Sequence, residues 1–158
     1  MNKDKISAFT LRISSSNKTG IIGVLYDIYK EYELDAREAF SSGDNEEAVA
    51  ALNKCSEVVS HLQKDLNFNY SVSKNLYSLY DYVQRCISRA IYQGKADALD
   101  EAKSVMDSLG EAFSQVAKED DSAPLMKNTQ KVVAGYTYGR NTLNESFLGD
   151  QSNRGFWA

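Results

Sequence analysis

Apolar residues recur every three or four positions through four long segments of this chain, and no proline interrupts any of them. The segments cover about residues 18–41, 44–66, 72–93 and 98–116. The single proline, Pro124, follows the last segment. Since proline is the strongest helix breaker, the pattern predicts four long helices, each apolar on one side only.

Residues suited to helix ends flank these segments. Asn17, Asp44 and Asp97 stand where an N-cap side chain would accept hydrogen bonds from free backbone N–H groups of the first turn. Gly43 and Gly94 stand where the left-handed residue after a helix is expected. These residues predict where the helices begin and end.

The connections between the segments are short, and short loops join antiparallel neighbours. The fold class expected is therefore all-α: an antiparallel, up-and-down four-helix bundle over residues 17–121, with the four apolar stripes facing a common axis. Residues 1–16 are expected to form an N-terminal extension, and residues 122–158 a partly disordered C-terminal extension.

The two ends differ in pattern from the middle of the chain. Residues 6–14 alternate apolar and polar side chains at Phe9, Leu11 and Ile13, which is the period of a strand. Residues 131–138 are rich in β-branched and aromatic side chains. Two interpretations stay open: the ends pair as a small two-stranded β ribbon, or they are flexible extensions.

Composition excludes several classes of function. The net charge is −4 and the pI about 5.1, which argues against nucleic acid or an anionic membrane as the main ligand. No window of eighteen apolar residues and no signal-peptide pattern occurs, so we expect a cytoplasmic protein. Cys55 and Cys86 fall on apolar positions of the helical patterns and are expected to be buried thiols.

Catalytic and metal-binding patterns are missing from the sequence. His61 is the only histidine, with no second histidine for a paired device, and the chain has no Gly-rich phosphate loop and no Cys-x-x-Cys pair. We therefore predict that the protein is not an enzyme, and that it has no catalytic residues, no metal site and no cofactor.

Tyrosine is the unusual feature, with ten in the chain. Helical geometry in the third segment points Leu76, Leu79 and Val83 at the core. Tyr77 and Tyr82 then project from opposite shoulders of that helix, and helical spacing also places Tyr26 of the first segment off the core axis. Such tyrosines either pack on the flank of the bundle or form a contact surface, because tyrosine offers a large area and a polar tip.

Two glycines near the start of the first segment, Gly20 and Gly23, also allow two interpretations. Each permits a close approach to the helix backbone, either by a neighbouring helix or by a partner.

Residues 73–85, SKNLYSLYDYVQR, resemble the signature of the FliS family of flagellar export chaperones, which combines Asn-Leu, Leu-Tyr-x-Tyr and basic residues. Leu25-Tyr26-Asp27 and the Ser-Gly-Asp at residues 42–44 resemble further parts of that pattern, with similar spacing between the parts. The resemblance covers about residues 17–120.

The resemblance implies a chaperone that binds the disordered C-terminal segment of flagellin in the cytoplasm, prevents premature polymerisation and assists delivery for type III flagellar secretion. The residues expected to bind the partner are Ile22, Tyr26, Tyr29, Tyr77, Tyr80 and Tyr82. An alternative is a divergent helical adaptor or regulator of another cytosolic flagellar protein. Whether export-apparatus proteins or regulators also bind, and whether the chain is a monomer or a dimer, stays open.

Overall fold

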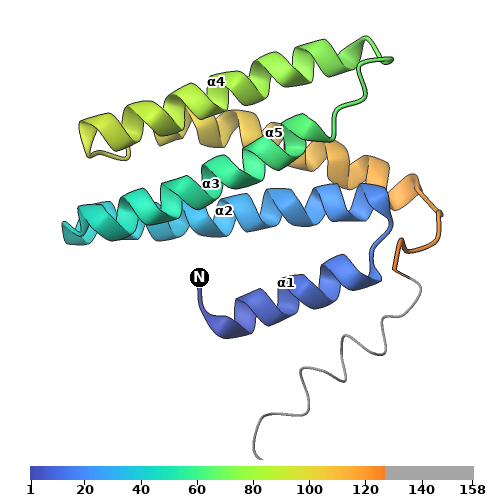
Figure 1. Ribbon diagram of the computed structural model, residues 1–158, viewed down its shortest axis with the longest axis horizontal. Coiled ribbons are helices and arrows are strands. Elements are labelled where there is room, and N and C mark those ends of the chain that lie inside the picture. The colour runs from blue at the N-terminus through green and yellow to red at the C-terminus, as the bar shows by residue number, and fades with distance from the viewer. Residues whose placement is uncertain (127–158) are drawn as a thin grey trace, which may run out of the picture.

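The computed structural model describes residues 1–126, which form five helices and no strand (Figure 1). They are α1 (Lys3–Ser15), α2 (Lys18–Ser42), α3 (Asn45–Lys64), α4 (Val72–Gln93) and α5 (Leu99–Glu119). The all-helical class predicted from the sequence is confirmed for this part of the chain. Residues 127–158, which include residues 131–138 of the ribbon interpretation, lie outside the described residues.

Most of the predicted helix ends are confirmed. The side chains of Asn17 and Asp44 each accept a hydrogen bond from a backbone N–H in the first turn of α2 and α3, at 2.8 and 2.9 Å. Gly43 and Gly94 follow α2 and α4 with positive φ angles of 81° and 62°. Because glycine has no Cβ, it adopts this left-handed conformation without the steric cost that other residues meet.

The cap expected at Asp97 is wrong. Ala98 precedes the first residue of α5, and no side chain caps that end. Instead, the Leu99 N–H donates to the Ala96 carbonyl oxygen at 2.8 Å, so a backbone turn leads into the helix.

Four of the helices pack around a shared core. α2 contacts α3 and α5, and α4 contacts the same two helices, with consecutive helices running in opposite directions (Figure 1). Both cysteines are free and buried, as predicted. The largest fully buried side chains are Tyr29, Tyr80, Leu52, Ile87, Leu99, Glu33, Val59 and Val83, followed by the two cysteines and Ser14.

The strand interpretation of residues 6–14, one of the two left open, is wrong, because these residues lie within α1. Asn2 caps this helix by accepting from the Lys5 N–H at 2.9 Å, and Asp4 places a negative charge in its first turn. Phe9 and Ile13 are four residues apart and both half-buried, so the short alternation that resembled a strand also fits one side of a helix.

Among the helices, α1 contacts only α2, on the side away from α4 (Figure 1). Ion pairs hold it there: the Met1 amino group lies 2.6 Å from Asp35, and Arg12 lies 2.6 Å from Asp27. No helix among the described residues is long and apolar enough to cross a membrane.

Candidate partner-binding surface

Three of the tyrosines predicted to bind a partner lie in the core. Tyr26 is 6% exposed, and Tyr29 and Tyr80 are 1% exposed, so the expectation that Tyr26 projects away from the core is wrong. The Tyr26 and Tyr80 hydroxyls lie 2.6 Å apart and link α2 to α4. Burial raises the pKa of both phenols, which keeps them neutral hydrogen-bonding groups.

The error at Tyr26 has a packing origin. α2 contacts α1, α3 and α5, so more of its circumference is covered than a helix with one apolar stripe would need. The Tyr26 ring stacks on Phe113 of α5 with centroids 5.6 Å apart. Ile22, also predicted to bind the partner, is half-buried against the core.

A groove runs between α2 and α5 and is lined by two of these buried tyrosines. Its larger section, about 450 Å³, lies beside Tyr26, Tyr29 and Glu33 of α2 and Gly110 of α5. A second section, about 360 Å³, continues from Tyr26 and Gly110 toward the start of α2 and is bordered by Arg12 of α1. Gly110 packs beside Tyr26: a Cβ there would lie 3.4 Å from the Tyr26 side chain, an ordinary van der Waals contact. The two tyrosines thus help to shape the groove although little of their surface is exposed.

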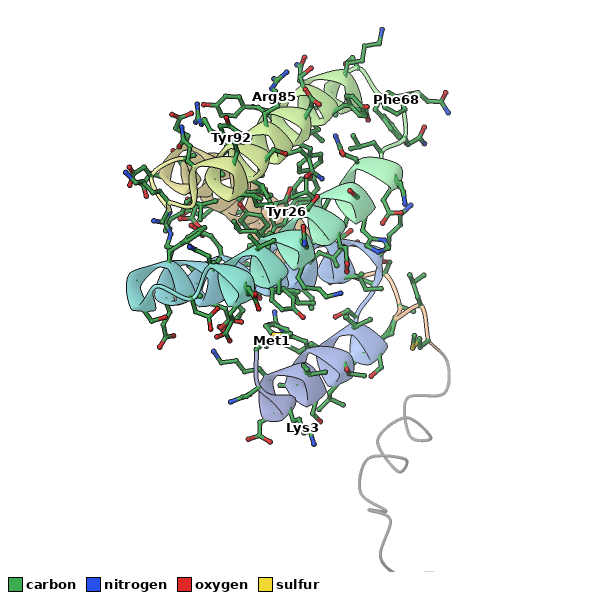
Figure 2. All side chains as sticks on the ribbon, turned by 60° about the vertical axis from the view of Figure 1, so that its left-hand side comes forward. Met1, Lys3, Tyr26, Phe68, Arg85 and Tyr92 are labelled. Atoms are coloured by element: carbon green, nitrogen blue, oxygen red, sulfur yellow. The ribbon has the colours of Figure 1, made fainter. Side chains whose placement is uncertain are left out.

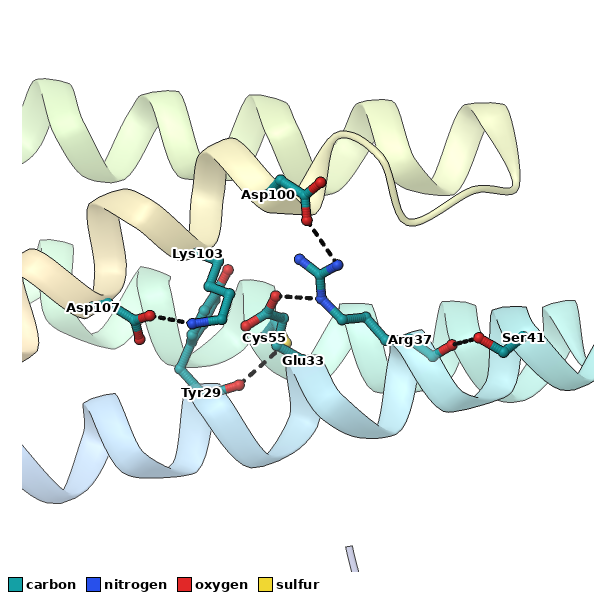
Figure 3. A network of polar contacts seen from close by, with 8 residues as sticks. All are labelled: Tyr29, Glu33, Arg37, Ser41, Cys55, Asp100, Lys103 and Asp107. Carbon is teal, nitrogen blue, oxygen red and sulfur yellow. Dashed lines mark hydrogen bonds and ion pairs between the residues drawn. The ribbon is translucent and has the colours of Figure 1, made fainter.

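Next to the larger section of this groove, a polar network connects α2 to α5 (Figure 3). Glu33 is 1% exposed, and its carboxylate accepts from Arg37 Nε at 2.7 Å. Arg37 also pairs with Asp100 of α5 at 2.9 Å, which ties α2 to α5. Burial raises the pKa of the Glu33 carboxyl, and the Arg37 guanidinium opposes that rise.

The tyrosines of α4 are more accessible than those of α2. Tyr77 is 47% exposed, which agrees with its predicted place on a shoulder of the helix. Tyr82 is half-buried, and its hydroxyl donates to the Glu101 carboxylate of α5, which raises the pKa of Tyr82 to about 12. Leu79, expected to point at the core, is 38% exposed, and that expectation is wrong.

Tyr77 belongs to a cluster of exposed apolar side chains where α3 connects to α4. Phe68 and Tyr70, in the connection, are 55% and 65% exposed, and Val72 at the start of α4 is exposed as well. The rings of Phe68 and Tyr77 lie 6.0 Å apart. Figure 2 shows Phe68 beside this connection, with Tyr92 toward the other end of α4. We call these four residues, Phe68, Tyr70, Val72 and Tyr77, the aromatic end patch.

Three members of this patch, Phe68, Tyr70 and Val72, were not among the residues predicted to bind a partner. Residues 67–71 fall between two predicted helices, and loops lie on the surface, where an aromatic side chain finds little cover. Two aromatic residues within a five-residue loop were the available signal.

The arrangement suits binding by contact. Aromatic side chains provide a large contact area at low entropic cost and are enriched where proteins bind one another. Within residues 1–126, no group of three or more His, Cys, Asp and Glu residues is placed to hold a metal ion.

The family model described as "Flagellar protein FliS" matches residues 6–120 of the 158. No curated protein matches the chain.

Proposed function

Since the chain belongs to the FliS family of flagellar proteins, we propose that it is a cytoplasmic export chaperone that binds the C-terminal segment of flagellin. FliS is a family of flagellar export chaperones and not of enzymes. The choice of ligand, the cytoplasmic location and the contact surface are our proposals. We take α2 to α5 as the antiparallel four-helix bundle of this chaperone.

The observation that carries the choice of surface is the aromatic end patch. Isolated exposed apolar residues are common on proteins, whereas a cluster of large ones is typical of an interaction site. Phe68 and Tyr77 already lie close together. A partner segment that covers these rings removes apolar area from water without first having to unfold any helix.

A ligand that becomes ordered on binding needs strong anchors. Ordering a disordered segment costs about 2–5 kcal/mol of the gross interaction energy. A buried aromatic anchor, when truncated, commonly costs about 2 kcal/mol or more. Tyr77 is the predicted partner-binding residue with the greatest exposure, so we assign it this role. Tyr26 and Tyr29 line the groove between α2 and α5, but their side chains expose too little surface to act as primary anchors.

The test is calorimetric titration of the full chain with a flagellin C-terminal fragment. Tyr77→Ala should weaken binding at least roughly tenfold, equivalent to about 1.4 kcal/mol, because the anchor loses its ring. Tyr92→Ala is the matched control: Tyr92 lies on the same helix, is 92% exposed and stands outside the aromatic end patch. Its removal should leave the affinity unchanged.

Two results would contradict the proposal in different ways. If the unmodified chain does not bind the fragment, flagellin is not the ligand. If binding survives both Tyr77→Ala and Phe68→Ala, the function stands and the aromatic end patch is not the surface.

A further inference from the structure

Gly23 in α2 has no packing reason to be glycine within the described part of the chain. A Cβ built at Gly23 would meet no atom there within 4 Å, whereas one at Gly20 would lie 3.0 Å from Asn17 Oδ1. A glycine inside a helix lowers stability relative to alanine because the unfolded backbone is freer. Contact with the preceding turn therefore accounts for Gly20, whereas no contact among the described residues requires glycine at position 23.

Gly23 lines the smaller section of the groove between α2 and α5, which also borders α1. Gly110 and Ala117 of α5 line the same section, so small side chains leave helix backbone close to the surface of the groove. This suits a polypeptide segment, whose own backbone can come close to a helix only where the side chains are small.

The chain itself passes the edge of this groove. After α5, the Leu125 N–H donates to the Ser16 carbonyl oxygen at 3.2 Å, and Ser16 lines the groove. The described part ends at the next residue, Met126. From Lys18 to Gly23 the helix rises about 7.5 Å, and the two extended residues from Ser16 to Lys18 add at most about 7 Å, while six residues can span about 20 Å. Residues directly after Met126 can therefore reach Gly23.

The residues that follow have a suitable composition. Residues 127–138, KNTQKVVAGYTY, contain two lysines, no acidic residue and four large apolar or aromatic side chains, those of Val132, Val133, Tyr136 and Tyr138. Residues 1–126 are acidic, with twenty Asp and Glu against fourteen Lys and Arg. The groove lining is mixed in charge, with Asp27 and Glu111 beside Lys30, Lys118 and Arg12, so the choice of this segment rests on its apolar side chains and on where residue 126 lies. We propose that residues 127–138 bind in the groove between α1, α2 and α5, with their backbone against Gly23.

The experiment uses the full chain without flagellin, so its outcome does not depend on the proposed function. A photo-crosslinker replaces one tyrosine, Tyr138→benzoylphenylalanine, and mass spectrometry identifies the crosslinked peptides after irradiation. We expect crosslinks within one molecule, to residues 20–27 or 110–118. Covalent dimers, or crosslinks only to other parts of the chain, would overturn the proposal.

A second variant tests the role of Gly23. Gly23→Ala, made in the crosslinker-bearing chain, should lower the crosslink yield severalfold because the methyl group occupies the space that the segment needs. It should also raise the melting temperature by about 2–4 °C, since alanine is the better helix former. Ser88→Ala, on the exposed face of α4, is the control and should leave the yield unchanged. An unchanged yield in Gly23→Ala would overturn the proposal.

Discussion

The two ends of the bundle differ in the turns that connect their helices and in how many large apolar side chains they expose. One end holds the α2–α3 and α4–α5 connections. At this first end, which we call the closed end, each connection passes through a left-handed glycine. The two connections adjoin, because a Cβ on Gly94 would lie 3.8 Å from the Asn45 side chain. Arg37 adds a link from α2 to Asp100 of α5.

The opposite end, the open end, has a longer α3–α4 connection. Phe68, Tyr70 and Tyr77 are exposed there together, whereas Tyr92 is an isolated exposed side chain near the closed end. Val116, in the last turn of α5, is exposed as well.

The difference separates stability from binding. The closed end uses tight turns and a buried ion pair, which lower the energy of the folded chain alone. The open end leaves large apolar side chains in water, which contributes little to folding and provides area for a partner to cover. If this division is correct, substitutions at the closed end should lower stability, and those at the open end should affect binding alone.

The largest effect is expected for Arg37→Met at the closed end. The change leaves the buried Glu33 carboxylate without its cation, and breaking a buried pair typically costs about 3–5 kcal/mol. Burial already raises the pKa of Glu33, so the folded state holds the proton more tightly than the unfolded state. The Glu33 carboxyl therefore stabilises the folded protein at pH values below its ordinary pKa. This contribution is lost as the pH rises through its raised pKa in the folded state.

Without Arg37 the pKa of Glu33 should rise further, so the loss of stability should be greater at pH 8 than at pH 5. Denaturant unfolding at both pH values measures this loss. Arg85→Met is the control: it breaks an exposed pair with Asp81 and should cost less than about 0.5 kcal/mol at either pH. Equal losses for Arg37→Met at the two pH values would contradict the role given to Glu33.

A middle-sized effect is expected for Gly43→Ala. The positive φ of Gly43 is strained for alanine and should cost about 1–2 kcal/mol of unfolding free energy, although no atom blocks the new methyl group. The same substitution at Gly23 should instead raise stability by up to about 1 kcal/mol, because Gly23 lies inside α2 without a positive φ. Thermal melts of both variants show whether the sign changes with position as expected.

The smallest effect on stability is expected for Phe68→Ser in the aromatic end patch. Because the ring is more than half exposed, the change should alter the unfolding free energy by less than about 0.5 kcal/mol. Phe113→Ser, which removes a ring stacked on Tyr26, should cost several times as much. If Phe68→Ser unfolds the protein as readily as Phe113→Ser, the open end stabilises the fold and the comparison between the ends fails.

Local chemistry explains which parts of the fold could be predicted from the sequence. The caps at Asn17 and Asp44 and the glycines at 43 and 94 act within one helical turn, so neighbouring residues suffice to identify them. Cys55 could be assigned to the core because it continues an apolar helical stripe. The family too was recognisable from short motifs.

Helical spacing placed Tyr77 correctly, but only the tertiary structure decided that Tyr26 is buried. Periodicity gives the direction of a side chain around its own helix, but not how many neighbours cover that helix. Tyr26 is buried because α2 is covered on several sides, while Leu79, on the expected core stripe of α4, remains partly exposed. The alternation at Phe9 and Ile13 fitted a strand or a helix equally, and packing against α2 accompanies the helix. Burial is a property of neighbours distant in the chain, and for that reason it could not be determined from the sequence of one helix.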